Sequence, residues 1–262
     1  MCPTLFHIGP VPIHGYGLML AVGFLVAMYL AQRNAKYFDI SEKKLADLFP
    51  WIIIAGAAGA RLFHVVVERP AFFWEHTLDI FKLWDGGVTF YGGLIGGVLV
   101  VYIFSRRNKI PFIKIGDFLI TYVALGQVFG RLGCFLAGCC YGIPTDLPWG
   151  IAIMNPDSVT RPLCIPLHPT QLYQAAVNLI TFIILYKMSW RKKFTGQILL
   201  LYGLTFPVGR SIVEIFRGDE IRGYIVPGII TTSQGISILI FVPCLITYII
   251  ISRHLKKKQR SL

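Results

Sequence analysis

The sequence predicts an all-α integral membrane protein with about seven transmembrane helices, its N-terminus outside and its C-terminus in the cytoplasm. Hydrophobic residues make up 55% of the chain and charged residues only 15%. A soluble domain of 262 residues needs more polar surface than this composition supplies, whereas a chain dissolved in lipid does not. Two further observations, the spacing of apolar runs and the placement of basic residues, give the number and direction of the helices.

Seven apolar runs are long enough to cross a bilayer, which takes about 17–25 helical residues. They cover residues 15–32, 46–66, 87–104, 115–133, 169–188, 196–216 and 234–252. The second, third and fourth contain small-residue pairs that let helix backbones approach closely in lipid. These pairs are Gly56 and Gly59, Gly92 and Gly96, Gly93 and Gly97, and Gly126 and Gly130. The fourth and sixth runs also carry charge, and the chain is predicted to be a single polytopic domain over residues 1–262.

The basic residues set the direction of these helices. Most of the 25 lysines and arginines fall in the segments 33–45, 105–114, 187–193 and 253–262, which alternate along the chain and would share one side. The positive-inside rule places that side in the cytoplasm. The net charge of +12 therefore reflects topology, and nucleic acid is not an expected partner because the basic runs lack interleaved aromatic residues. The segment 134–168, rich in Pro, Gly and Cys, is predicted to be a structured loop on the outer side.

Four ionisable residues lie toward the predicted outer ends of apolar runs: Arg61, Arg131, Arg210 and Glu214. An arginine at membrane depth costs about 2.5–3.5 kcal/mol on insertion scales, so each one indicates a function or a structural pair. Glu214 lies four residues after Arg210, and Arg217 three further on, so all three share one helix face. A structural role is favoured for Arg61 and a functional one for Arg131 and Arg210.

Two polar motifs accompany these arginines. The stretch GRLGCFLAGCCYG (130–142) places a turn rich in glycine and cysteine after Arg131, and HPTQLY (168–173) supplies hydrogen-bonding side chains. Glycines admit backbone N–H groups to a ligand, and the forked donors of arginine suit phosphate. Together with four tyrosines, these motifs predict a pocket for an anionic lipid headgroup. The tyrosines are Tyr16, Tyr91, Tyr141 and Tyr173.

Cys134, Cys139, Cys140 and Cys164 leave several roles open. A metal is not expected, because the spacing lacks a C-x-x-C pair and adjacent cysteines chelate zinc poorly. A disulfide from Cys164 to one of the others suits the oxidising side. A nucleophilic role lacks a base at fixed spacing, so packing is the simplest interpretation, as it is for Cys244.

Five motifs, taken in order, carry a resemblance to a known family: IHGYGLML (13–20), GGVTFYGGLIGG (86–97), GRLGCFLAGCCYG, HPTQLY and GRSIVEIFRGD (209–219). Over essentially its full length the chain resembles the bacterial phosphatidylglycerol–prolipoprotein diacylglyceryl transferases. The resemblance implies a multi-pass enzyme of the bacterial cytoplasmic (inner) membrane with its active site toward the outer side. It also implies two substrates that lie in the membrane lipid: phosphatidylglycerol, and prolipoprotein signal peptides with a lipobox cysteine. It implies no cofactor.

In the implied reaction, the lipobox thiol attacks the glyceryl carbon that bears the phosphate, forming a thioether and releasing glycerol phosphate. Arg131 and Arg210 would hold the phosphodiester, stabilise the leaving phosphate and favour the thiolate, with Glu214 orienting Arg210. The predicted catalytic residues are Arg131, Arg210, Glu214, Tyr16, Tyr91 and His168. The predicted substrate-binding residues are Arg131, Gly133, Cys134, Gly142, Gln171, Tyr173, Gly92 and Gly93.

The chain departs from the family pattern at three positions. Well-known members have His where this chain has Tyr91, and many have Asn at Cys134 and an acidic residue near Cys139. The base that deprotonates the thiol therefore stays open between His168, Tyr91 and activation by the arginines alone. A membrane transporter for an anionic lipid or small anion is the alternative function, although no internal repeat supports it. A thiol–disulfide membrane enzyme is the third.

Overall fold

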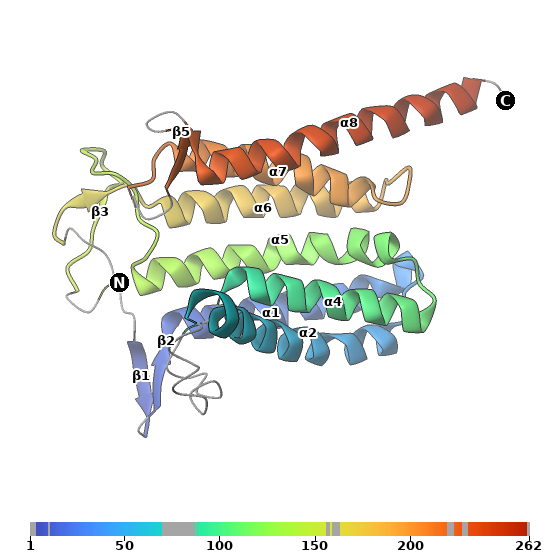
Figure 1. The fold of residues 1–262 in the computed structure, drawn as a ribbon. Coiled ribbons are helices and arrows are strands. Elements are labelled where there is room, and N and C mark those ends of the chain that lie inside the picture. The colour runs from blue at the N-terminus through green and yellow to red at the C-terminus, as the bar shows by residue number, and fades with distance from the viewer. Residues whose placement is uncertain are drawn as a thin grey trace. The chain divides into compact units, whose positions relative to one another are not determined.

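The computed structural model describes residues 4–9, 11–69, 87, 89–155, 158, 163–218, 223–226 and 230–260. Seven α-helices run through this part of the chain (Figure 1). They are α1 (Gly15–Ala35), α2 (Glu42–Phe63), α4 (Phe90–Asn108), α5 (Phe112–Ala137), α6 (Thr170–Ser189), α7 (Gln197–Glu214) and α8 (Thr232–Arg260). Each predicted apolar run overlaps one of these helices, which confirms the prediction of a helical protein.

Five helical stretches are long and apolar enough to cross a membrane: Gly15–Phe38, Glu42–Glu68, Phe112–Ala137, Thr170–Ser189 and Thr232–Leu255. The first two continue α1 into a 3₁₀ turn, Lys36–Phe38, and α2 into a π-helical turn, His64–Glu68. The other two helices, α4 and α7, are the shortest of the seven, at 19 and 18 residues, and both contain charged residues. The helices therefore support a polytopic membrane protein, while the count of seven spans stays a prediction.

The loops contain short strands that the sequence did not suggest. Three antiparallel pairs are formed by β1 (Thr4–Ile8) with β2 (Val11–His14), β3 (Ile151–Ala152) with β4 (Pro166–Leu167), and β5 (Tyr224–Val226) with β6 (Ile230–Thr231). Within the described residues the fold is therefore helical with three small hairpins, and not purely α. The predicted structured loop at 134–168 contains β3 and β4, and further pairing joins Pro144 to Leu167.

The chain forms two compact units. Unit 1 comprises Met1–Tyr29 and Asp117–Leu262, and unit 2 comprises Leu30–Gly116. Helices α1 and α5 each run from one unit into the other, so the division falls inside continuous helices and at no linker. The predicted single domain remains a prediction, and each unit is described by itself below.

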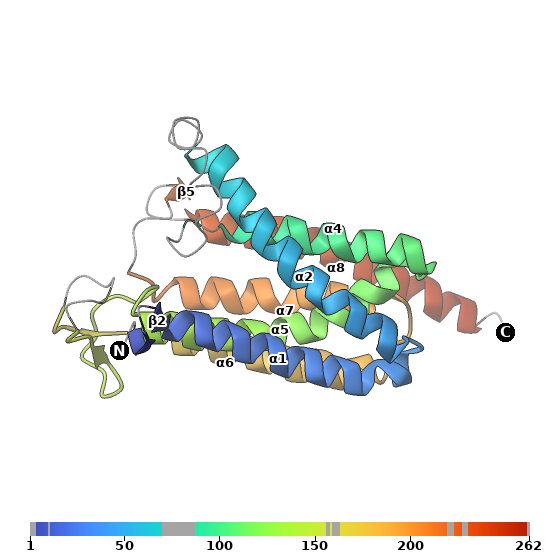
Figure 2. The ribbon, with the colours of Figure 1, turned by 90° about the horizontal axis from the view of Figure 1, so that it is seen from below.

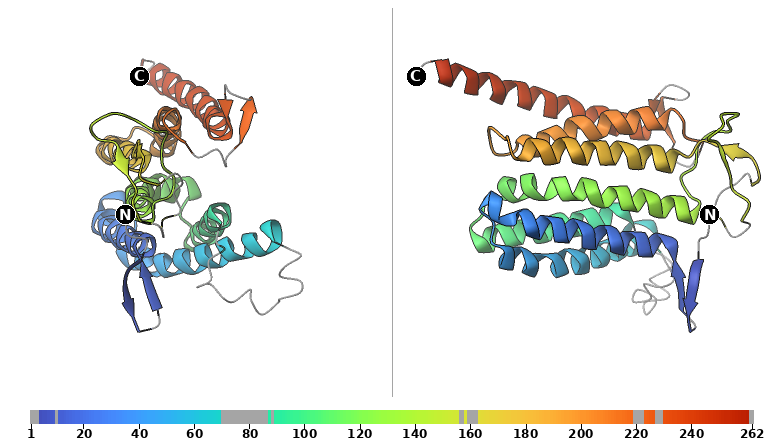
Figure 3. Two further views of the ribbon diagram at one scale, coloured as in Figure 1. Left: turned by 90° about the vertical axis from the view of Figure 1, so that its left-hand side faces the viewer. Right: turned by 180° about the vertical axis from the view of Figure 1, so that it is seen from behind.

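In unit 1, α7 lies between α6 and α8, and α5 runs along the opposite side of α6 (Figures 2 and 3). A core cluster of Ala124, Leu185 and Ile198 joins α5, α6 and α7. The buried carboxylate of Asp117 accepts hydrogen bonds from the backbone N–H groups of Ile198 (2.7 Å) and Leu199 (2.9 Å), and Lys192 lies 3.6 Å from it. An acid from α5 therefore caps the first turn of α7, where the helix leaves N–H groups without partners.

Helix α6 is polar on its inner side and aliphatic on its outer side. Its buried residues include Thr170, Gln171, Gln174, Asn178, Thr181 and Ser189. Its exposed large side chains are Leu179, Ile180, Ile183 and Ile184. This distribution is the reverse of that on a soluble helix and suits a helix whose outer face meets lipid.

Unit 2 is built on close contact between α2 and α4. A Cβ at Gly92 would collide with the carbonyl oxygen of Gly59, and one at Gly96 with that of Ala55. The predicted packing role of the Gly92–Gly96 pair is confirmed, whereas a Cβ at Gly97 would meet no described atom within 4 Å. Buried Arg61 donates to the carbonyl oxygen of Gly87 (3.2 Å), which fits its favoured structural role.

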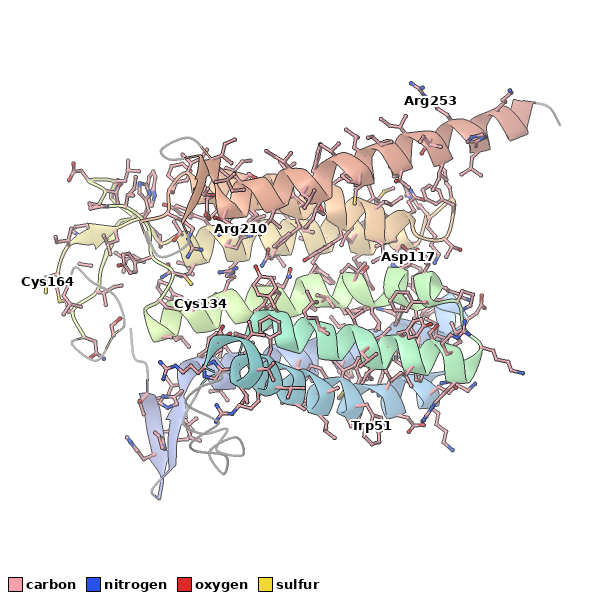
Figure 4. The ribbon with its side chains drawn as sticks, in the orientation of Figure 1. Trp51, Asp117, Cys134, Cys164, Arg210 and Arg253 are labelled. Atoms are coloured by element: carbon pink, nitrogen blue, oxygen red, sulfur yellow. The ribbon has the colours of Figure 1, made fainter. Side chains whose placement is uncertain are left out.

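The hairpins of unit 1 gather at one end of its helices. This end holds the starts of α1, α6 and α8 and the ends of α5 and α7 (Figures 1 and 3). Cys134 and Arg210 lie toward this end, and Asp117 lies toward the other (Figure 4). Three motifs that are distant in sequence, GRLGCFLAGCCYG, HPTQLY and GRSIVEIFRG, therefore meet here.

Candidate active site

The turn after α5 is fixed by the first residues of α6. Thr170 donates its hydroxyl to the carbonyl oxygen of Cys140, and Gln171 donates its side-chain amide to that of Cys139, both at 2.7 Å. Gly138 (φ +72°) and Cys140 (φ +64°) have left-handed backbone conformations. A non-glycine residue in this region is strained and persists only where its surroundings hold it. The predicted substrate-binding residue Gln171 thus holds the turn.

A second set of backbone bonds ties the same turn to both neighbouring segments. Gly142 donates to His168 O and Ile143 to Phe216 O, both at 3.0 Å, and Gly218 donates to Tyr141 O at 3.3 Å. A Cβ at Gly142 would lie 2.5 Å from both His168 Cβ and Phe216 O. Close packing therefore requires glycine at 142, and its predicted contact with substrate stays a prediction.

The charged face of α7 forms the network that its spacing predicted. Arg210 and Glu214 form an ion pair of 2.5 Å, and Arg217 lies 3.9 Å from the same carboxylate oxygen. Arg210 also donates to the hydroxyl of Ser233 on α8 (3.2 Å). Arg210 and Glu214 are only 6% and 7% exposed. Two guanidinium groups around one carboxylate leave a surplus positive charge in a buried setting, which suits an anionic ligand.

Arg131, on the last turns of α5, has a different environment from Arg210. Within the described part of the chain its guanidinium forms no ion pair and no hydrogen bond, and it is half-buried. Its electrostatic neighbours include Tyr16, Cys134 and Tyr202, and the Tyr202 hydroxyl is hydrogen-bonded to Gln127 (2.8 Å). A half-buried arginine without a carboxylate nearby is available to a phosphate.

Tyr16, at the start of α1, lies against the same helix end. A Cβ at Gly133 would contact the backbone and ring of Tyr16 at 3.1–3.2 Å, so glycine lets α1 approach α5 here. Tyr16 interacts electrostatically with Arg131 and with the three thiols of Cys134, Cys139 and Cys140. The structure therefore brings together Tyr16, Arg131, Gly133 and Cys134, as the predicted site requires.

His168 is buried in an aromatic cluster. Its Nδ1 lies 3.1 Å from the Tyr173 hydroxyl, which also accepts a hydrogen bond from Trp149 Nε1 (2.8 Å). The ring of Phe216 packs against both His168 and Tyr173. These contacts orient the imidazole and give Tyr173 a structural partner. The predicted roles of His168 as a base and of Tyr173 in substrate binding stay predictions.

The thiols of Cys134, Cys139 and Cys140 form a compact cluster, each in hydrogen-bond contact with the other two. None of the five described cysteines is in a disulfide, and Cys164 lies outside this cluster. Hydrogen bonds from Cys134 and Cys139, assisted by Arg217, hold the pKa of Cys140 well below its usual range. Hydrogen bonds with Cys134 and Cys140 raise the pKa of Cys139. Of the two thiols after α5, Cys140, beside Arg217, is therefore the one that loses its proton more readily.

Comparison with known proteins agrees with the motifs that meet at this end of unit 1. The family described as prolipoprotein diacylglyceryl transferase matches residues 3–250. The chain belongs to this family. A phosphatidylglycerol–prolipoprotein diacylglyceryl transferase of Clostridium tetani is 36% identical over 241 residues, which cover 91% of this chain and 93% of the relative. Relatives of the same name from Bordetella avium (32% identity, 96% and 95% covered) and Pseudomonas fluorescens (36%, 90% and 88%) agree.

The GGLIG element of this diacylglyceryl transferase family member lies in unit 2, at the start of α4. Tyr91, at the position where a family histidine was expected, is 58% exposed, and its ring packs edge-on against Phe90. Gly92 packs on Gly59, and a Cβ at Gly93 would lie 3.3 Å from the carbonyl oxygen of Gly56. Helix packing accounts for both glycines, so their predicted contact with substrate, like the role of Tyr91, stays a prediction.

Three residues that contact the site residues of this family member were not predicted from the sequence. Ser233 binds Arg210, Thr170 holds Cys140, and Trp149 binds Tyr173. Ser233 and Trp149 lie outside the recognised motifs, and no sequence spacing connects them to their partners. Thr170 lies inside HPTQLY, where its polarity at the first position of a helix was an available signal.

Proposed function

We propose that this chain transfers the diacylglyceryl group of phosphatidylglycerol to the thiol of the lipobox cysteine of prolipoproteins. A thioether forms and glycerol phosphate leaves. The curated relatives carry this activity in their names. Within the molecule, the observation that carries the proposal is a half-buried Arg131 without a carboxylate partner in the described residues, in the same unit as the Arg210–Glu214–Arg217 network.

The reaction needs a cationic site around a phosphodiester. The thiolate sulfur attacks the glyceryl carbon, the C–O bond to phosphate breaks, and the phosphate oxygen takes the electron pair. Arg131 would bind the phosphodiester and stabilise this charge, because preorganised donors in a dry site favour the transition state over the ground state. Arg210, fixed by Glu214 and Ser233, would supply the second guanidinium.

We place the enzyme in the bacterial cytoplasmic membrane with seven spans, the N-terminus outside and the active site toward the outer side. The support is the alternation of basic segments along the chain and the gathering of the site residues at the end of unit 1 that holds the start of α1. Secreted precursors present their lipobox cysteine on that side, and both substrates would reach the site laterally through the bilayer.

The test uses purified protein, phosphatidylglycerol and a lipobox peptide. The expected product is a peptide with a thioether-linked diacylglyceryl group, detected by its mass, together with free glycerol phosphate. A peptide with serine in place of the lipobox cysteine should give no product. If a folded preparation makes none with the cysteine peptide either, but moves an anionic lipid or small anion across a vesicle membrane, the transporter alternative replaces this proposal.

A further inference from the structure

The cysteine cluster has the dimensions of a metal site. The sulfur atoms of Cys134, Cys139 and Cys140 all lie within 4.8 Å of one another. A metal ion about 2.3 Å from three sulfurs, in trigonal or tetrahedral geometry, needs the sulfurs about 3.8–4.0 Å apart. The upper limit of 4.8 Å exceeds that separation by about 1 Å at most. We propose that these three cysteines bind one thiophilic metal ion of the Zn²⁺ class and leave its fourth position open.

The backbone explains why the sequence spacing argued against this site. Cys134 and Cys139 are five residues apart and would not face each other on a continuous helix. Helix α5 ends at Ala137, and left-handed Gly138 turns the chain so that Cys139 donates its N–H back to Cys134 O (3.1 Å). Left-handed Cys140 then places the adjacent thiol in the same cluster. Three ligands are thus presented by one helix end, without a C-x-x-C pair.

The surroundings hold the turn and match its charge. Thr170 and Gln171 fix the carbonyl groups of Cys140 and Cys139, so the turn is built by two elements. Three thiolates with a divalent ion carry one net negative charge, and Arg217 donates to the Cys140 sulfur. Such outer contacts orient metal ligands and strengthen binding.

The open position suggests a use, which rests on the proposed function. Zinc sites with three protein ligands keep the fourth for water or substrate, and a thiol bound to zinc is deprotonated. The lipobox thiol would bind there, releasing its proton to solvent. Its sulfur would form the bond to the glyceryl carbon while the C–O bond breaks and the electron pair leaves with the phosphate. This arrangement generates the thiolate without a histidine at position 91.

The first experiment measures metal binding alone, by titrating reduced, metal-free protein with Cd²⁺ and following sulfur-to-metal charge-transfer absorption, with Zn²⁺ as competitor. We expect one Cd²⁺ per chain, displaced by Zn²⁺. Cys134→Ser, Cys139→Ser and Cys140→Ser should each weaken binding by more than the roughly 10–100-fold that loss of an outer contact costs. Cys164→Ser and Cys244→Ser are matched controls that should bind as the unaltered protein does. No charge-transfer band in the unaltered protein, or equal loss in the controls, overturns the metal site whatever the transferase activity.

The second experiment adds a lipobox peptide, without lipid, to the Cd²⁺-loaded protein. A cysteine peptide should increase the charge-transfer absorption by one further sulfur ligand, and a serine peptide should not. Equal spectra with both peptides overturn the use of the open position. Full transfer by protein shown to be metal-free does the same. If Cd²⁺ binds as expected but no transfer occurs with metal, the proposed function fails and the metal site stands.

Discussion

At the scale of single residues, the two arginines on α5 and α7 differ in how their charge is balanced. Arg210 is held by Glu214 and Ser233, whereas Arg131 has no carboxylate beside it in the described segments. A membrane protein that keeps an arginine half-buried in this way bears its insertion cost without a compensating pair. That cost is best explained by an anionic substrate that completes the site.

Replacing Arg131 tests this explanation directly. Arg131→Ala should lower the rate of transfer by about 10²–10³-fold, the usual effect of removing one preorganised donor. Arg131→Lys should recover part of the rate, because lysine supplies the charge but not the forked donors. Thioether product is the measurement, and monodisperse elution in detergent shows that each variant is folded. Near-normal turnover of Arg131→Ala would mean that the side chain only packs.

Tyr91 provides the contrasting case. The side chain is largely exposed at the start of α4 and contacts the ring of Phe90, a contact that does not use its hydroxyl. Tyr91→Phe should therefore keep most of the transfer activity when assayed beside Arg131→Ala. Loss as severe as that of Arg131→Ala would make the hydroxyl group catalytic.

Sequence reasoning found those site residues whose relation is local. The Arg210–Glu214 pair follows from a spacing of four on one helix, and the structure confirms it. The thiol cluster was not foreseen, because it depends on where α5 ends and on two left-handed residues beyond that end. Ser233 contacts Arg210 from another helix, and such a contact has no periodic signal in the sequence.

At the scale of elements, glycine contacts decide how α2 and α4 pack. Gly92→Ala should destabilise the protein by about 1–3 kcal/mol, because its Cβ would meet the backbone of Gly59, which cannot move aside as a side chain can. Gly97→Ala, on the same helix with no described atom within 4 Å, should leave stability unchanged or slightly higher. Thermal unfolding in detergent compares the two, and equal midpoints would refute this account of the packing.

The capping of α7 by Asp117 is a second contact between elements. Asp117→Ala leaves the buried N–H of Ile198 and the partly buried N–H of Leu199 without their acceptor and should cost about 1–3 kcal/mol. Asp39→Asn is the control, because the Asp39 carboxylate is 92% exposed and lies 3.7 Å from Lys114, so loss of its charge should change little. Asparagine also tolerates the left-handed backbone at this position (φ +53°). If both variants unfold at the same temperature as the parent protein, the cap contributes nothing.

The positions of the helices could be predicted because lipid selects long apolar runs, and each predicted run contains the centre of an observed helix. The hairpins could not be predicted. The strands β3, β4, β5 and β6 are only two or three residues long, too short for the alternating pattern that identifies a strand. They form because backbone pairing between loop segments distant in the sequence stabilises them. The antiparallel bridge between Gly142 and Arg217 is an example of such pairing.

At the scale of the whole molecule, the proposed orientation can be measured in intact cells. Cys164 is exposed in the 134–168 loop, and Lys257 is exposed near the end of α8. In chains with a single cysteine, a membrane-impermeant maleimide should label Cys164 from outside. A cysteine introduced as Lys257→Cys should react only after permeabilisation. The opposite pattern would invert the topology and place the site in the cytoplasm.

The polar inner side of α6 has a consequence for how the protein is made. Among the five candidate spans α6 has the lowest mean hydropathy, 1.2, against 2.4 for α8, because it carries several amide and hydroxyl side chains, which are buried in the protein. Alone in lipid, Gln171, Gln174 and Asn178 would lose both water and their protein surroundings. The insertion machinery should therefore release α6 to the bilayer together with α5 or α7. Because α5 is synthesised before α6, it is already present to pack against the polar side chains of α6.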